Sequence, residues 1–219
     1  MAHATSLVAD LQRFAAALVW GYAAHITPEG LTPEMTAREA APGCWYVEGL
    51  SALGSPANAN FISNAGFVVT SAGVVVIDAL GSPALAERLV AEIKKITPQK
   101  ITHVVLTHYH ADHVYGMQVF EKLGARIIAP QAGREYLYAD TARLRLEQSR
   151  KDLAPWIDEQ THLAAATEWI DARRELTVGD TRLVIQPVGP AHTPEDLALY
   201  LPDKKVLYAG DLVFRSRIP

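Results

Sequence analysis

Apolar and polar positions alternate along the chain in a way that predicts short strands interrupted by amphipathic helices. Ser82 and Pro83 begin a helix whose apolar residues recur on one face until Thr97 and Pro98 end it. A second apolar helical pattern runs over residues 114–123. β-Branched and aromatic runs bounded by turn residues predict strands at 45–47, 61–62, 67–70, 74–77, 103–106, 126–129, 182–188, 197–201 and 205–208. Strands and helices that follow one another in this way predict an α/β fold.

Two segments depart from the alternation. Residues 1–42 join a helical apolar pattern to a loop rich in Pro and Gly, and predict an N-terminal helix and loop that pack on the core. A secretory signal is the alternative there, but Asp10 lies in what would be its basic region. Residues 131–170 place apolar side chains among charged ones without a convincing strand, and predict a helical insert within a single domain over 43–219.

Composition and charge exclude several classes of protein. Of 219 residues, 49% are hydrophobic and 20% are charged, as in globular proteins. The net charge of −4 lacks the basic excess of nucleic-acid binders, so no nucleic-acid partner is expected. The longest nearly apolar run, 14–24, is too short for a membrane-spanning helix. A single cysteine, Cys44, leaves the compartment open, with the cytoplasm favoured over a secreted location, and nothing in the sequence specifies the oligomeric state.

Three histidines and an aspartate stand within six residues, between an apolar strand and a helix. They are His108, His110, Asp112 and His113. Imidazole and carboxylate are ligands that suit zinc and its borderline neighbours. Residues two apart in an extended segment project to one side, so His108 and His110 can share an ion, whereas Asp112 and His113 are offset towards a second one. The carboxyl end of a strand is also where α/β folds bind ligands, so this motif predicts a metal site.

Two later residues are candidates to complete the site. His192 lies in the turn Gly-Pro-Ala-His-Thr-Pro between two predicted strands, and Asp211 follows another strand in Ala-Gly-Asp. Taken alone, His192 reads as a surface histidine and Asp211 as a residue that caps a turn. Their positions at strand ends and loops nevertheless allow them to converge on the His-rich motif.

The order His-x-His-x-Asp-His, then His-Thr-Pro, then Gly-Asp after a strand resembles the metallo-β-lactamase superfamily, over residues 45–219. The resemblance implies an αββα sandwich made of two similar halves. It implies two zinc ions: a first held by three histidines and a second held by one histidine and two aspartates. These ligands are His108, His110 and His192 for the first ion, and Asp112, His113 and a bridging Asp211 for the second. Asp78, at the end of strand 74–77, matches an aspartate that orients backbone and ligands without touching metal.

The resemblance also implies that one ligand is missing. Members with two ions supply a further histidine well after the Gly-Asp strand, whereas this chain ends eight residues beyond Asp211. We therefore expect a truncated piece of a longer protein with an incomplete second half. His162 is the only spare histidine downstream of the motif, and we do not favour it as a replacement. With three protein ligands against the four of a closed zinc site, the second ion is expected to be the weaker one.

The implied activity is hydrolysis of an acyl bond. Two zinc ions lower the pKa of a shared water to about 7 and present hydroxide to a carbonyl carbon, while Asp112 orients that water and accepts its proton. An aspartate at position 211 is more similar to the thioesterase and general hydrolase branches, such as glyoxalase II, than to many true β-lactamases. The expected partner is thus a small-molecule ester, thioester or lactam.

Two alternatives stay open at this stage. The persulfide dioxygenase branch keeps the same His and Asp set with iron in place of zinc, and the ligands fit either metal. The third possibility is a metal-binding fragment without catalytic activity. We also expect the helical insert 131–170 to border the active-site cleft, because it lies between the His-rich motif and His192.

Overall fold

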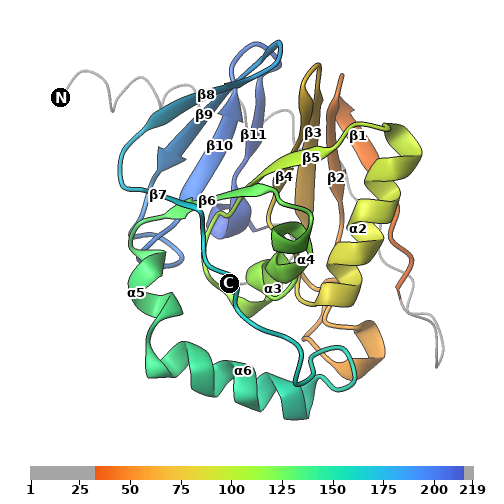
Figure 1. The fold of residues 1–219 in the computed structure, drawn as a ribbon, viewed down its shortest axis with the longest axis vertical. Helices are drawn as coiled ribbons and strands as arrows, with labels where there is room; N and C mark the ends of the chain where they lie inside the picture. The colour runs from red at the N-terminus through yellow and green to blue at the C-terminus, as the bar shows by residue number, and fades with distance from the viewer. Residues whose placement is uncertain (1–32, 215–219) are drawn as a thin grey trace.

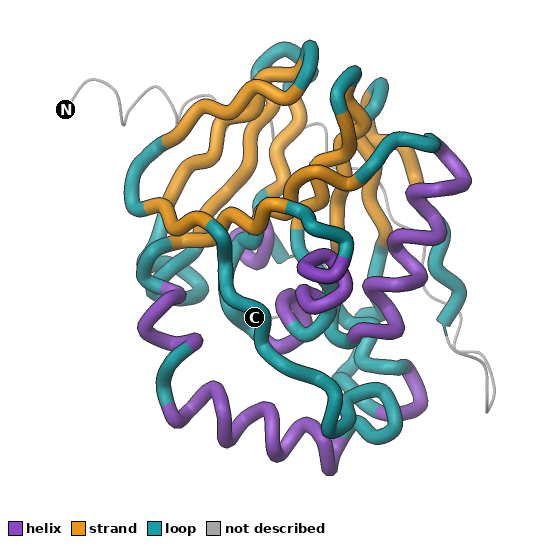
Figure 2. Tube along the Cα trace, viewed as in Figure 1, coloured by secondary structure: helices purple, strands orange, loops and turns teal. Residues whose placement is uncertain are grey.

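The computed structural model describes residues 33–214 and arranges them as two β-sheets, with the helices gathered on one side (Figures 1 and 2). The first sheet has seven strands in sequence order: β1 (Arg38–Ala41), β2 (Cys44–Val47), β3 (Ala65–Thr70), β4 (Gly73–Ile77), β5 (Ile101–Val105), β6 (Arg126–Pro130) and β7 (Glu168–Ile170). The second sheet has four: β8 (Arg174–Val178), β9 (Thr181–Pro187), β10 (Leu197–Leu201) and β11 (Val206–Tyr208). The helix predicted near the N-terminus lies outside the described residues.

Strand direction decides where the helices stand. Strands β1 to β4 pair antiparallel, and β4 to β7 pair parallel, so each parallel step needs a crossover. The crossovers are α2 (Pro83–Ile96), then α3 (Ala111–Val114) with α4 (Met117–Lys122), then α5 (Gly133–Leu137) with α6 (Asp140–Asp152). After β7 the described chain holds only strands and the short 3-10 helix η3 (Gly210–Leu212). None of the described helices is long and apolar enough to span a membrane.

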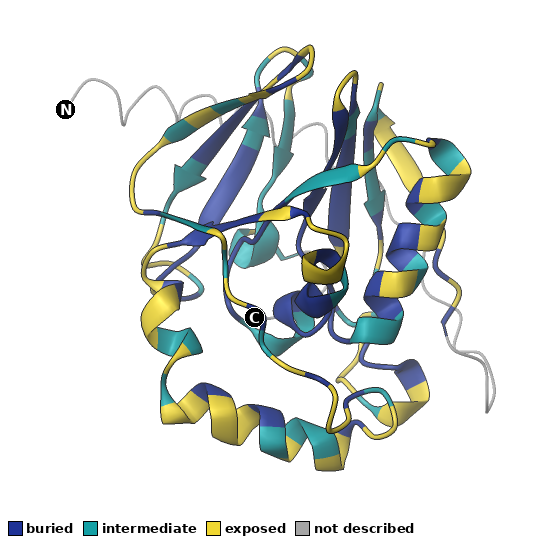
Figure 3. Ribbon diagram, viewed as in Figure 1, coloured by how far each residue is buried: buried dark blue, intermediate teal, exposed yellow. Residues whose placement is uncertain are grey.

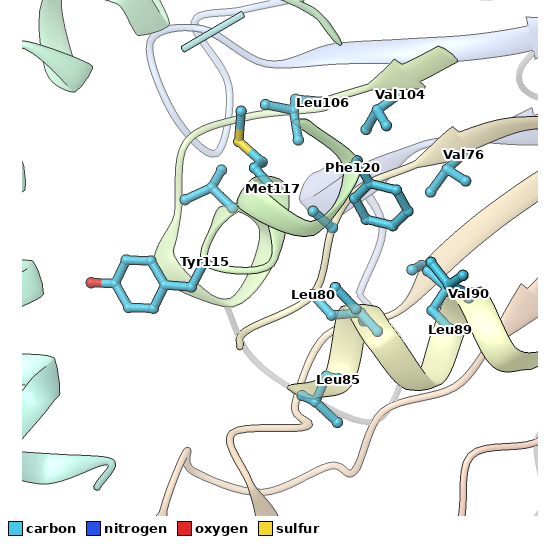
Figure 4. Packing of buried hydrophobic residues seen from close by; sticks show 14 of the residues in the cluster. Val76, Leu80, Leu85, Leu89, Val90, Val104, Leu106, Tyr115, Met117 and Phe120 are labelled. Carbon is cyan, nitrogen blue, oxygen red and sulfur yellow. The ribbon is translucent and has the colours of Figure 1, made fainter. Parts of the chain in front are cut away.

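Two apolar layers hold these elements together. All five residues of β4 are buried because this strand is covered on both faces (Figure 3). Val75 and Ile77 pack towards the second sheet, against residues such as Leu199, whereas Val74 and Val76 pack towards the helices (Figure 4). The described residues thus form the α, β and β layers of an αββα sandwich.

Helix α2 matches its sequence prediction at both ends. The Ser82 hydroxyl accepts a hydrogen bond from the backbone N–H of Leu85, and Pro83 occupies the first turn. Leu85, Leu89 and Ile93 are buried on one face, while the opposite face is exposed (Figure 3). The residues at its two ends and the period of its apolar residues were therefore sufficient to predict helix α2.

Several sequence predictions of secondary structure are wrong. Residues 61–62 form a loop, in which the Phe61 N–H donates to the Asn58 carbonyl. The single helix predicted over 114–123 is broken into α3 and α4, because the N–H of Gly116 donates to the Leu80 carbonyl. A Cβ at Gly116 would lie 2.0 Å from the Ala79 carbonyl oxygen, so only glycine allows this close approach.

Three strands were not predicted. Strand β1 is a largely exposed, charged edge strand, and β7 has only three residues at the opposite edge, too few for a recognisable period. Residues 131–170 thus contain helices α5 and α6 but end in a strand of the first sheet. In β8, Leu176 and Val178 alternate with polar residues, a signal that the sequence did contain. The domain organisation proposed from the sequence stays a prediction.

Candidate metal centre

The ends of four segments bring the predicted site residues to one edge of the sandwich. Asp78 follows β4, the His-rich motif follows β5, His192 lies in the loop between β9 and β10, and Asp211 lies in η3 after β11. Two groups have donor atoms within 4.8 Å of one another: His108, His110 and His192, and His108, His113 and Asp211. His108 belongs to both. The two groups therefore lie side by side, although their role as metal ligands stays a prediction.

The first group consists of three imidazoles. The Nε2 atom of His192 lies 3.0 Å from Nδ1 of His110, and the His108 ring centroid lies 4.8 Å from that of His110 and 5.2 Å from that of His192. Burial and the neighbouring His192 lower the pKa of His110. A low pKa keeps imidazole neutral, with a lone pair available to a cation.

A buried carboxylate, Asp78, connects both groups to the first sheet. Its Oδ1 accepts the Thr107 N–H at 2.8 Å, and its Oδ2 accepts the Thr107 hydroxyl and Nδ1–H of His113, each at 2.9 Å. Asp78 adopts a positive φ of 63°, which Asp tolerates better than most residues, and its own N–H donates to the Val105 carbonyl. Asp78 thus lies where an orienting residue is expected and is in neither donor group.

This network determines which nitrogen of His108 is free. The Thr107 hydroxyl donates to Asp78, so at 3.0 Å from Nδ1 of His108 its oxygen accepts the Nδ1–H. Nε2 then carries a lone pair, and it is buried without a hydrogen-bond partner in the described part of the chain. Burial, followed by the nearby His113, lowers the pKa of His108 to about 2. A buried, unpartnered lone pair is costly unless a cation occupies it, so this donor fits a metal ion.

The second group is held together by charge. Nε2 of His113 lies 3.3 Å from Oδ1 of Asp211 and 3.7 Å from Oδ2 of Asp112. Burial opposes the charged form of His113, but Asp78 and Asp211 outweigh it and raise the pKa of His113 well above its ordinary value. Burial likewise opposes ionisation of Asp211, yet His113 lowers the pKa of this carboxyl to about 2. Nε2 of His113 is buried without a hydrogen-bond partner among the described residues, and a proton on it would compete with a second cation.

Asp211 and Asp112 take different positions. Oδ2 of Asp211 lies 3.6 Å from Nε2 of His192, so its carboxylate reaches both groups, as expected of a bridging ligand. Asp112 belongs to neither compact group. It lines a cavity of about 250 Å³ together with Arg145 and Ser149 of α6. The helical insert thus borders the space beside Asp112.

Some residues that shape the centre were missed by sequence reasoning. Thr107 sets the tautomer of His108, and the only signal was its position before the first histidine. Asp196 accepts hydrogen bonds from the N–H and hydroxyl of Thr193, which closes the loop that carries His192. The pattern Thr-x-x-Asp was visible in the sequence. His162 pairs with Glu121 at 3.1 Å and is in neither donor group.

Both a family model and individual proteins match this chain. The model of the metallo-beta-lactamase superfamily matches residues 59–219. A metallo-beta-lactamase type 2 of Elizabethkingia meningoseptica is 26% identical over 153 residues, which cover 70% of this chain and 53% of that protein. The alpha subunit of a 2,4-dinitroanisole O-demethylase of Nocardioides sp. (strain JS1661) is 27% identical, with 65% and 38% covered. The chain spans about half the length of the metallo-beta-lactamase relatives it matches.

Solved structures share the same fold. A metallo-beta-lactamase from Pontibacter korlensis superposes with a TM-score of 0.60 at 19% identity, over 80% of this chain and 71% of that one. A sec-alkylsulfatase from Pseudomonas sp. superposes with a TM-score of 0.59 at 23% identity, over 79% and 30%. At these identities the likeness concerns the fold. It fits the sandwich expected from the sequence, and this chain covers only part of each neighbour.

Proposed function

The chain belongs to the metallo-beta-lactamase superfamily of metal-dependent hydrolases, and on this premise we propose that it is a zinc-dependent hydrolase of an acyl bond. The substrate would be a small-molecule ester, thioester or lactam. The observation that carries the proposal is the pair of donor groups that share His108, whose buried Nε2 has no hydrogen bond to any described residue. Neutral imidazole and carboxylate oxygen are the donors that zinc prefers.

The donor set supports two ions. His108, His110 and His192 would hold the first, and His113 with Asp211 and Asp112 would hold the second. When bound, zinc lowers the pKa of a coordinated water to about 7 and polarises a substrate carbonyl. Nothing in this assignment needs a Ser or Cys nucleophile, and Cys44 is fully buried in β2.

Asp112 is the residue that we assign to proton transfer. Its Oδ2 lies 3.7 Å from Nε2 of His113, and its side chain, 22% exposed, also lines the cavity. A carboxylate in this place would orient a water between the donor groups and the cavity and accept its proton. Asp78 and Thr107 would keep the imidazoles aligned during the reaction.

The test is hydrolysis by the purified chain after metal analysis. We expect bound zinc, turnover of para-nitrophenyl esters, an aryl thioester or a chromogenic lactam, and loss of turnover with retained folding in Asp112→Asn. Sulfate esters and aryl ethers belong in the same panel, because a sulfatase and an O-demethylase subunit are among the similar proteins. Iron together with sulfur-dependent oxygen uptake would favour the dioxygenase alternative. Metal binding without turnover of any of these substrates would contradict the proposal.

A further inference from the structure

The cavity beside Asp112 is also lined by a positively charged side chain, that of Arg145, which has no role in the proposed hydrolysis. We propose that Arg145 of α6 binds a carboxylate on the substrate, which makes anionic acyl compounds the preferred substrate class. This inference rests on the proposed function and narrows it. It concerns a residue in the insert, outside both donor groups.

Buried residues fix the rotation of helix α6, so exposed Arg145 is on the side of the helix that borders the cavity. Ala142 and Leu146 are buried towards the core. One turn after Arg145, the Ser149 hydroxyl lies 3.0 Å from the Tyr115 hydroxyl. In Figure 4 the Tyr115 hydroxyl points away from the labelled apolar side chains. Residues four apart lie on the same side of a helix, and both Arg145 and Ser149 line the cavity that Asp112 also lines.

The Arg145 guanidinium lacks the partners that its neighbours have. Arg143 pairs with Asp140 and Glu147, and Arg150 donates to two backbone carbonyls. No described residue makes an ion pair or hydrogen bond with Arg145. An unpaired guanidinium offers a carboxylate two parallel N–H donors in one plane.

Two carboxylates that line the same cavity do not use this cation. Asp152 accepts a hydrogen bond from Nε2 of Gln148 at 2.9 Å, and Asp112 faces Nε2 of His113 at 3.7 Å. Arg145 lines this cavity together with Asp112, whose Oδ2 lies 3.7 Å from Nε2 of His113, so the cavity connects the guanidinium with the donor groups. A substrate could therefore place its carboxylate at Arg145 and its acyl carbon near Asp112.

The test compares two esters that differ in a single group. Para-nitrophenyl butyrate and para-nitrophenyl hemisuccinate have acyl chains of equal length, ending in a methyl group and a carboxylate respectively. In the zinc-loaded chain we expect Arg145→Gln to raise KM for the hemisuccinate by about tenfold or more, the loss typical of a charge-assisted contact, with little change in kcat. KM for the butyrate should stay the same, and Arg145→Lys should recover part of the loss. Arg143→Gln, an equal change of charge on the same helix, should leave both esters unaffected.

A binding measurement separates this inference from the proposed function. Succinamate and butyramide are the matching amides, and ligand-observed NMR on the metal-free chain reports their binding without turnover. Tighter binding of succinamate, lost in Arg145→Gln and kept in Arg143→Gln, would support the anion site even if no ester is hydrolysed. Equal binding of the two amides by the unmodified chain, or equal KM effects of Arg145→Gln on both esters, would overturn it. Absence of zinc-dependent turnover with a succinamate preference would contradict the proposed function alone.

Discussion

The two donor groups share one histidine and differ in how their charges are arranged. In the first, burial lowers the pKa of both His108 and His110, helped by His113 at His108 and by His192 at His110. The lowered pKa values favour neutral imidazoles. In the second, Asp78 and Asp211 flank His113, raise its pKa and so favour its protonated form. The first group offers lone pairs, and its nearest carboxylate is that of Asp211, 3.6 Å from Nε2 of His192. The second offers negative charge that favours a proton on His113.

This difference indicates that the two groups would bind a cation in different ways. A cation entering the first group meets His108 and His110, whose lowered pKa values favour the neutral imidazole. A cation entering the second must displace the proton of His113. The expectation of a weaker second ion, drawn from the number of ligands, thereby gains an independent electrostatic reason.

Removal of the shared histidine should abolish the distinction. We expect His108→Ala to lose metal from both groups and to lower hydrolysis by more than about 100-fold, above the loss typical of residues that only orient ligands. His113→Ala should lose only the weaker ion. Zinc per chain, measured after desalting, distinguishes these outcomes, and His162→Ala is the control outside both groups. Unchanged zinc in His108→Ala would refute its assignment as the common ligand.

Asp78 connects the groups, so its charge should affect both. In Asp78→Asn one oxygen that accepts two hydrogen bonds is replaced or reoriented, so that His113 and Thr107 lose a common partner. We expect zinc affinity to fall about 10- to 100-fold at both groups, as for other partners of metal-bound histidines. Asp203→Asn, at an exposed turn, is the matched control. A loss confined to one group, seen by zinc titration, would mean that Asp78 does not align both.

How far the sequence predicted this centre depends on how local each contact is. His108, His110 and His113 were identified because they are close in the chain, next to a predicted strand. His192 and Asp211 were placed only through the resemblance, since no local pattern indicates which loops meet. The Thr107 hydroxyl donates to Asp78 and accepts from His108, and Arg145 lines the cavity. Both features depend on contacts between distant segments, which periodicity does not encode. For the same reason helix α2 was predicted fully, whereas the short edge strand β7 was not.

A glycine pair should test whether Asp211 must reach the second group. Gly210 has φ +54°, and an added Cβ would lie 2.7 Å from Cβ of Thr107. Gly124 has φ +73° with no heavy atom within 4 Å of such a Cβ. Gly124→Ala should cost about 1 kcal/mol in free energy of unfolding, from backbone strain alone. Gly210→Ala should cost about 2 to 4 kcal/mol and displace Asp211.

Thermal unfolding and zinc stoichiometry measure the two parts of that prediction. The first ion should be retained in Gly210→Ala, because none of its three proposed histidine ligands lies in η3. Equal destabilisation by the two substitutions, with both ions retained, would show that the contact with Thr107 does not position Asp211.

The smallest effect, and the most specific to the comparison, is the response to pH. The raised pKa of His113 contributes stability that is fully present below its ordinary value of 6.5 and is lost as pH rises through the folded pKa. The lowered pKa of Asp211 contributes stability present above 3.8 and lost as pH falls through about 2. The metal-free chain should therefore lose stability at high pH, where its imidazolium loses the proton.

Bound zinc should reverse this dependence of stability on pH. Because the second ion replaces one proton, its affinity should rise by up to about tenfold per pH unit until the pKa of His113 is passed. Affinity at the first group should change less over the same range, since the lowered pKa values of His108 and His110 favour their neutral form. Calorimetric zinc titration at several pH values resolves the two steps, and buffers of different ionisation enthalpy count the protons released. Greater proton release with the second ion than with the first is the expected result. Equal proton release in both steps would mean that the two groups do not differ in the charge they hold.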